Sequence, residues 1–312
     1  MGYQILVTGG AGYLGSTMVP ELLAAGHRVT VLDNFMYDQN SLAHVCNHSG
    51  FEVMRGDVRN ESAVLPLLRK ADIIIPLAAY VGAPLCARDP VGASTTNHDA
   101  IVTMLKHVSK HQRILMPTTN SAYGTGDVNN FCTEESPLKP MSLYAIEKVK
   151  VEKELMQHPN ATSFRLATVF GMSPRMRIDL LVNDFTYRAV HDRFVVLFEA
   201  NFKRNYIHVR DIARAFLHGI DNFEKTNGQI FNVGLSEANV SKKELCQVIQ
   251  KQIPEFTFIE APIGKDPDQR NYIVSNAKIE ATGYKPRVSL DAGIGELIKG
   301  YAMIRNSRYG NV

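Results

Sequence analysis

Short apolar runs alternate with longer, helix-length segments over the first half of the chain. Strands are predicted at residues 4–9, 28–33, 51–56, 71–79, 113–119 and 162–171. Several of these runs are continuously apolar, as expected where a strand is covered on both faces. The repeated strand–helix–strand order predicts an α/β fold, a Rossmann-type doubly wound parallel sheet.

The pattern loosens after about residue 172. Residues 173–192 predict a loop followed by a helix, and 194–198 predict a strand. A late helix is predicted over 241–253, where Ser241 and Glu244 have the spacing of a capping box. We therefore expect a Rossmann domain over 1–172 and a smaller C-terminal substrate-binding lobe over 173–312, completed by segments that cross between them.

Composition and charge narrow the choice of partners. The 312 residues have a net charge of +3, and Lys and Arg are spread along the chain, which argues against nucleic-acid or polybasic membrane binding. The most apolar stretch, 73–87, contains two prolines and is shorter than the ~18–20 residues of a spanning helix. The chain starts almost directly on a strand, so we expect no signal peptide and a cytoplasmic protein.

The four cysteines are scattered, without a Cys-x-x-Cys pair or a nearby His pair. They are Cys46, Cys86, Cys132 and Cys246. This spacing predicts buried or free thiols in a reducing compartment rather than a metal site or a catalytic Cys86.

A glycine-rich turn follows the first predicted strand. In "VTGGAGYLG", Gly9, Gly12 and Gly15 stand three residues apart. Such glycines allow a tight turn, a close approach of backbone to pyrophosphate and close helix packing, and the helix N-terminus then faces the phosphates. Asp33 ends the next strand, where its carboxylate can accept hydrogen bonds from a ribose 2′-hydroxyl and repel a 2′-phosphate. The turn and Asp33 predict NAD rather than NADP, and Pro20 is predicted to kink or restart the first helix.

A Tyr-x-x-x-Lys pair lies further along the chain. Tyr144 and Lys148 share a face of a helix, and a neighbouring ammonium favours the phenolate form of tyrosine. The phenolate can take a proton from a substrate hydroxyl while hydride leaves the same carbon for NAD. Thr119, at the end of a strand in "PTTNSAYG", can hold the substrate oxygen from the other side. These three residues are the predicted catalytic group.

The chain resembles the extended short-chain dehydrogenase/reductase family of nucleotide-sugar epimerases and dehydratases over almost its whole length. The matching segments include "VTGGAGYLG", "VLDN", "TTNSAYG", "YAIEK", "FRLATVFG" and "RNYIHVRDIARAF". The resemblance implies a homodimer and maps the catalytic Ser/Thr of the family to Thr119. It implies NAD contacts at Gly9, Gly12, Tyr13, Leu14, Gly15, Asp33, Asn34, Asp57, Val58, Leu77, Ala78, Ala79, Asn97, Tyr144 and Lys148.

The resemblance also implies a substrate half. Arg204 and Arg270 match positions that grip a nucleotide diphosphate, for which forked guanidinium bonds are suited. The remaining substrate-binding residues that we predict are Val81, Asn120, Ser121, Thr168, Asn183, Val196 and Leu197.

The residues after Thr119 bear on the reaction. The 4,6-dehydratases of the family have Asp and Glu there, because elimination of water needs an acid and a base. Asn120 and Ser121 stand at these positions and do not ionise usefully near neutral pH, which argues against a dehydratase. A non-catalytic dinucleotide sensor is a further alternative, which the presence of all three catalytic residues disfavours.

Three outcomes then remain for a sugar oxidised at C4: re-reduction on the other face, epimerisation at neighbouring carbons, or release of the ketone. Thr168 departs from ordinary 4-epimerases, which carry Asn there. The segments "LAAYVGAPLC" and "SPRMRIDLLVNDFTYRA" resemble those of bacterial GDP-heptose 4-dehydrogenases. We therefore expect a GDP-sugar 4-dehydrogenase, with a UDP-sugar as the other substrate class and a 4-epimerase or 3,5-epimerase as the alternative.

Overall fold

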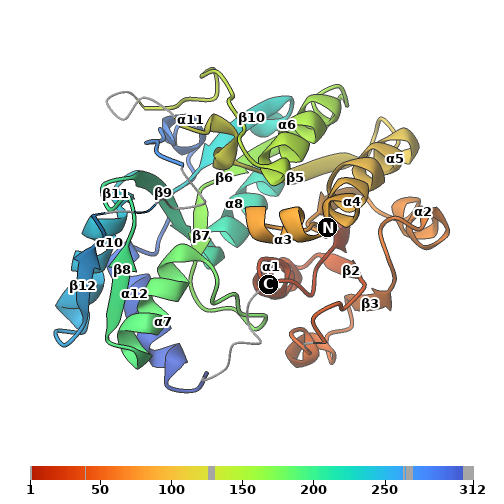
Figure 1. Cartoon of the computed structure of the whole chain (residues 1–312). Coiled ribbons are helices and arrows are strands. Elements are labelled where there is room, and N and C mark those ends of the chain that lie inside the picture. Colours follow the sequence, from red (N-terminus) through yellow and green to blue (C-terminus); the bar gives the residue numbers. More distant parts are fainter. Residues whose placement is uncertain (1, 39, 126–130, 263, 265–269, 305–312) are drawn as a thin grey trace.

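The computed structural model describes residues 2–38, 40–125, 131–262, 264 and 270–304. Within these residues, seven parallel strands form one large sheet in the order β10-β6-β5-β4-β1-β2-β3 (Figure 1). The strands are β1 Gln4–Thr8, β2 Arg28–Asp33, β3 Phe51–Arg55, β4 Ile73–Pro76, β5 Arg113–Thr119, β6 Ala161–Leu166 and β10 Gln229–Val233. The predicted Rossmann-type parallel sheet is confirmed.

Helices cover both faces of this sheet. In β1, Ile5 and Val7 face the core made with α1 (Gly15–Ala24) and α8 (Val209–Asp221). Leu6, between them, faces the opposite core, made with α2 (Glu61–Leu68), α5 (Ala100–His107) and α6 (Leu143–Leu155). The central strands are therefore continuously apolar because both of their faces are buried.

The predicted strand 162–171 is two strands in two sheets. β6 ends at Leu166, and after Ala167 the chain enters β7 (Thr168–Phe170), which pairs with β9 (Lys203–His208). A three-stranded sheet results, in the order β11-β9-β7, with β11 at Asn239–Ser241. A continuous apolar run does not reveal this change of partner, so the single-strand prediction was wrong.

The C-terminal part has a core of its own. It packs α7 (Leu181–His191), α10 (Lys242–Gln252) and α12 (Leu290–Tyr301) around the two-stranded sheet of β8 (Phe194–Leu197) and β12 (Thr257–Glu260). The division at residue 172 stays a prediction, since β10 comes from the later part of the chain and extends the large sheet beside β6. The shorter helices are α3 Ala83–Arg88, α4 Pro90–Ser94, α9 Phe223–Thr226 and α11 Ala277–Glu280.

Two local predictions have different outcomes. The capping box is confirmed: the Ser241 hydroxyl accepts from the Glu244 N–H, and the Glu244 carboxylate accepts from the Ser241 N–H. Helix α1 runs through Pro20 as one element, so the predicted restart does not occur. Among the helices that the structure describes, none is both long and apolar enough to cross a membrane.

Candidate active site

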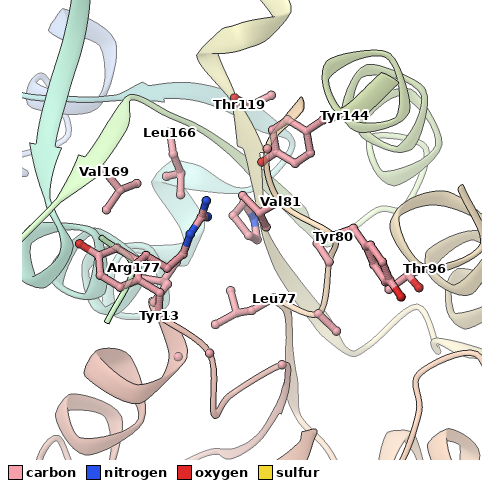
Figure 2. Close-up of a pocket in the computed structure, with 18 of the residues that line it drawn as sticks. Tyr13, Leu77, Tyr80, Val81, Thr96, Thr119, Tyr144, Leu166, Val169 and Arg177 are labelled. Atoms are coloured by element: carbon pink, nitrogen blue, oxygen red, sulfur yellow. The ribbon is translucent and has the colours of Figure 1, made fainter. Parts of the chain in front are cut away.

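A cavity of about 310 Å³ lies at the carboxyl ends of the large sheet (Figure 2). Its lining includes Gly9, Asp33, Leu77, Thr119 and Leu166, which lie at or just after the ends of β1, β2, β4, β5 and β6. This edge is where open α/β sheets bind their ligands. The cavity's other side is formed by the segment between β7 and α7.

The glycine-rich turn forms one wall of the cavity. Gly9 has a φ of +70°, and a Cβ there would lie 2.5 Å from the backbone nitrogen of Ala78. A Cβ at Gly12 would meet only the Gly9 carbonyl, at 3.2 Å, so the turn leaves room for a close approach by a ligand. The N-terminus of α1 follows directly, with backbone N–H groups suited to a pyrophosphate. The turn therefore fits the predicted dinucleotide.

Asp33 and Asp57, two of the predicted NAD contacts, also line the cavity. Asp33 accepts hydrogen bonds from the N–H groups of Ala11 (2.9 Å) and Phe35 (2.8 Å), while burial raises the pKa of its carboxyl. Asp57 pairs with Arg59 at 2.6 Å, and that hydrogen bond lowers the pKa of Asp57. Each Asp33 oxygen has a second lone pair for a ribose hydroxyl.

The three predicted catalytic residues meet in this cavity. Thr119 ends β5, and Tyr144 and Lys148 lie on α6, whose N-cap Ser142 accepts from the Ala145 N–H at 3.3 Å. Figure 2 shows Thr119 and Tyr144 close together, and Thr119 acts to lower the pKa of Tyr144. The α6 register therefore brings the pair to the end of β5, as the sequence predicted.

Burial sets the protonation of this group. It raises the pKa of Tyr144 to about 12, opposed by the positive charges of Arg177 and Arg270. It lowers the pKa of Lys148 to about 8, and the Lys148 ammonium donates to the Pro117 carbonyl at 3.3 Å. Without a ligand, the cavity therefore holds a protonated tyrosine beside a lysine that loses its proton easily.

Arg177 is a cavity residue that sequence analysis did not identify. It is 7% exposed, and its guanidinium pairs with Asp179. Figure 2 shows its side chain extending toward Val81, and its terminal nitrogen lies 3.8 Å from the place of a Cβ on Gly82. Nothing in "SPRMRID" distinguishes this arginine from an arginine at the surface. The direction of its side chain depends on the path of the chain after β7, which the local sequence does not specify.

Arg270 reaches the cavity from the C-terminal part of the chain. Its guanidinium donates to the hydroxyl of Ser121, which in turn accepts from the Thr119 hydroxyl at 3.0 Å. Val81 and Thr168 line the cavity with them. Asn120 does not: it is fully buried, and neither amide atom has a hydrogen-bond partner among residues whose placement is described.

Two predicted site residues, Asn97 and Asn183, hold the backbone of segments that form the cavity wall. Asn97 accepts from the Tyr80 N–H (2.7 Å) and donates to the Tyr80 carbonyl (2.9 Å), which fixes the segment that carries Val81. Asn183 accepts from the Gly171 N–H (3.0 Å) and donates to the Arg177 carbonyl (2.8 Å). Neither residue is part of the cavity lining, and their contacts to cofactor and substrate stay predictions.

Three further substrate-site predictions fall outside the cavity lining. Arg204 is 3% exposed on β9 and Leu197 is 1% exposed in the second core. Val196 lies on the outer face of β8, where it is 40% exposed. Consecutive side chains of a strand point to opposite faces, so β8 cannot present both Val196 and Leu197 to the same pocket. Elsewhere in the described ranges, no group of three or more His, Cys, Asp or Glu could hold a metal ion.

Comparison with known proteins agrees with this geometry. The NAD dependent epimerase/dehydratase family model matches residues 5–234. UDP-glucuronate 4-epimerase 4 of Arabidopsis thaliana is 25% identical over 334 residues, covering 96% of this chain and 75% of that protein. UDP-glucuronic acid decarboxylase 2 of the same plant is 28% identical over 314 residues, covering 96% and 68%. The solved UDP-glucuronic acid 4-epimerase from Bacillus cereus, with UDP-glucuronic acid and NAD, has the same fold (TM-score 0.85, 21% identity, coverage 96% and 99%).

Proposed function

The chain belongs to the NAD dependent epimerase/dehydratase family, its cofactor is NAD, and on this premise we propose that it oxidises the C4 hydroxyl of a nucleotide sugar. The observation that supports this most is the meeting of Thr119, Tyr144 and Lys148 in the cavity that Gly9 and Asp33 also line. Oxidation of a hydroxyl needs a proton acceptor beside its oxygen and a dinucleotide beside the carbon that bears it. This cavity has residues suited to both tasks.

The chain's own residues have separate tasks in this reaction. Bound NAD supplies the hydride acceptor and a positive ring. Tyr144 takes the proton of the sugar hydroxyl, and Thr119 holds the same oxygen by a hydrogen bond. Arg177 and Arg270 oppose the rise of the Tyr144 pKa that burial causes. A protonated Lys148 beside the tyrosine favours the phenolate as well. The segment between β7 and α7 contributes Arg175, Arg177 and Leu180 to the wall of the cavity.

The residues after Thr119 favour an outcome without elimination. Loss of water across C5–C6 needs an ionisable acid and base beside the sugar. Ser121 is neutral and accepts a hydrogen bond from Arg270, and Asn120 is not part of the cavity lining. We therefore favour release of the 4-keto sugar, with a GDP-heptose as the first substrate to test, in keeping with the "LAAYVGAPLC" and "SPRMRID" segments.

An epimerase is the second candidate. The relatives named above include two UDP-glucuronate epimerases, and an epimerase begins with the same oxidation. In that case the ketone is re-reduced on its other face, and a UDP-sugar is the substrate class.

The mass of the product separates the two functions. The protein is incubated with NAD and, in parallel, GDP-D-glycero-D-manno-heptose, GDP-mannose and UDP-glucose. Loss of two hydrogens from one of these sugars, with formation of NADH, is the result expected for a 4-dehydrogenase. An unchanged mass with a shifted chromatographic peak identifies an epimerase instead, and no change with any sugar argues against both.

A further inference from the structure

The segment between β7 and α7 is fastened to the start of α1. The Ser173 hydroxyl donates to the Tyr13 carbonyl at 2.7 Å and lies 2.9 Å from the Ser16 hydroxyl. The Arg175 N–H donates to that same Ser16 hydroxyl at 3.2 Å. The backbone of Arg175 is therefore held against the first turn of the helix that faces the dinucleotide site.

From this position the Arg175 side chain reaches the other wall of the cavity. Its guanidinium carbon lies 3.8 Å from the ring centroid of Tyr37, in the loop that follows β2. Arg175 is 2% exposed, and both side chains line the cavity. Tyr37 follows Asp33 by four residues, so the stack lies beside the predicted ribose site.

The charges around the stack suit a dinucleotide. Asp33 attracts the Arg175 guanidinium, and burial raises the pKa of Tyr37, so the phenol stays neutral under the cation. A guanidinium is also a good partner for the phosphate oxygens that the N-terminus of α1 faces. One arginine from the substrate side of the cavity thus supplies positive charge next to the dinucleotide half of the site.

We propose that Arg175 and Tyr37 form a clamp that binds the adenosine diphosphate half of NAD and limits its exchange. The clamp adds two cofactor-binding residues to the predicted set. One of them comes from a segment that the sequence assigned to the substrate. The inference goes beyond the proposed function, because it concerns cofactor retention and does not depend on which sugar is oxidised.

The test measures NADH dissociation without any sugar. NADH is bound, its fluorescence is followed after mixing with excess NAD, and the rate is compared among variants. Arg175→Ala and Tyr37→Leu should each release NADH about tenfold faster than wild type, because either one removes the stack. Tyr37→Phe keeps the ring and should stay within about twofold of the wild-type rate.

Arg55→Ala is the matched control. Arg55, the last residue of β3, stacks at 4.9 Å on Phe35, which lies in the same loop as Tyr37, but Arg55 does not line the cavity. If Arg55→Ala accelerates release as much as Arg175→Ala, loosening of the loop explains the effect and the clamp is refuted. Unchanged release in both Arg175→Ala and Tyr37→Leu also refutes it.

The double variant Arg175→Ala/Tyr37→Leu completes the cycle. The two residues act as one stack, so the double variant should release NADH no faster than the faster single variant. Independent, multiplicative effects would show two separate contacts and overturn the clamp. Should Arg175→Ala fold poorly, Tyr37→Leu against Tyr37→Phe gives the same comparison with the arginine in place.

Discussion

The guanidinium of Arg270 donates a hydrogen bond to the hydroxyl of Ser121, which lies 149 residues earlier in the chain. Ser121 lies two residues after the end of β5, so this bond joins the C-terminal part of the chain to the end of the strand that carries Thr119. The cation lies close enough to Tyr144 to oppose the rise of its pKa. Arg270 therefore belongs to the reaction cavity as well as to the predicted diphosphate site.

Arg270→Ala should raise the KM for the nucleotide sugar by about 10- to 100-fold, the loss expected for a charged hydrogen bond to substrate. The Kd for NADH should stay near the wild-type value. Both are measured by initial rates and NADH fluorescence. Arg188→Ala, which removes a half-exposed ion pair with Asp184 on α7, is the control and should change neither quantity. A parallel loss of NADH affinity would contradict a substrate role.

Tyr144→Phe should lower kcat by about 10²- to 10⁴-fold, because it removes the proton acceptor and little else. The buried ring remains, so folding and the Kd for NADH should not change. The measurement is the rate of absorbance increase at the NADH band with the active sugar. Turnover at the wild-type rate in this variant would remove Tyr144 from the mechanism.

The burial of Lys148 predicts a pH-dependent stability. Its pKa is about 8 in the folded protein and 10.5 in the unfolded chain, so between these values the unfolded state binds the extra proton. Stability of the dinucleotide-free protein should therefore rise as the pH increases from about 8 toward 10. Below pH 8 the buried ammonium costs the folded state about 3 kcal/mol, from 1.36 kcal/mol per pKa unit.

Lys148→Met isolates that contribution. At pH 7 the variant should have a free energy of unfolding about 3 kcal/mol higher than wild type, and the gap should narrow toward pH 10. Urea unfolding at pH 7, 8, 9 and 10 measures it. A gap that is constant with pH would show that Lys148 does not titrate in this range.

A buried ion pair supports the catalytic strand from behind. Arg165 and Glu152 lie 2.6 Å apart with 4% and 5% side-chain exposure. The Glu152 carboxylate also accepts from the hydroxyls of Thr118 (2.9 Å) and Ser163 (2.7 Å). Glu152→Ala leaves a buried cation without its partner and should lower the free energy of unfolding by about 3–5 kcal/mol.

The control for this prediction is an exposed pair in the same molecule. Lys243 and Glu260 lie 2.6 Å apart with 43% and 42% exposure. Lys243→Ala should cost less than about 1 kcal/mol, because water screens such a pair. Equal effects of the two substitutions in urea unfolding would mean that the buried pair gives no special support.

Local patterns in the sequence predicted the parts of the site that local structure determines. Gly9 lies in a strand–helix turn, and Tyr144 and Lys148 are one helical turn apart, so short-range geometry is enough to bring them to the cavity lining. The cavity lining also includes Arg175, Arg177 and Tyr37, which come together only through the path of the segment after β7. No short-range pattern contains that path.

The same reasoning explains why some predicted site residues lie outside the cavity lining. Asn183 and Arg204 have side chains that suit a nucleotide, but in the fold backbone groups and the core surround them. The end of β6 at Leu166 could not be predicted from the apolar pattern either, because β7 continues the apolar run in another sheet. The homodimer rests on the family resemblance and the cytoplasmic location on the expected lack of a signal peptide, and both stay predictions.

The position of β10 has a consequence during synthesis. Until β10 emerges, β6 is the open edge of the large sheet, with unpaired N–H and C=O groups along one side. Roughly 70 residues separate the ends of β6 and β10, which a ribosome takes several seconds to add at about 5–20 residues per second. During that interval the nascent chain exposes an unpaired edge strand that can pair with other chains. Chaperone binding to the nascent chain should therefore be strongest in that interval.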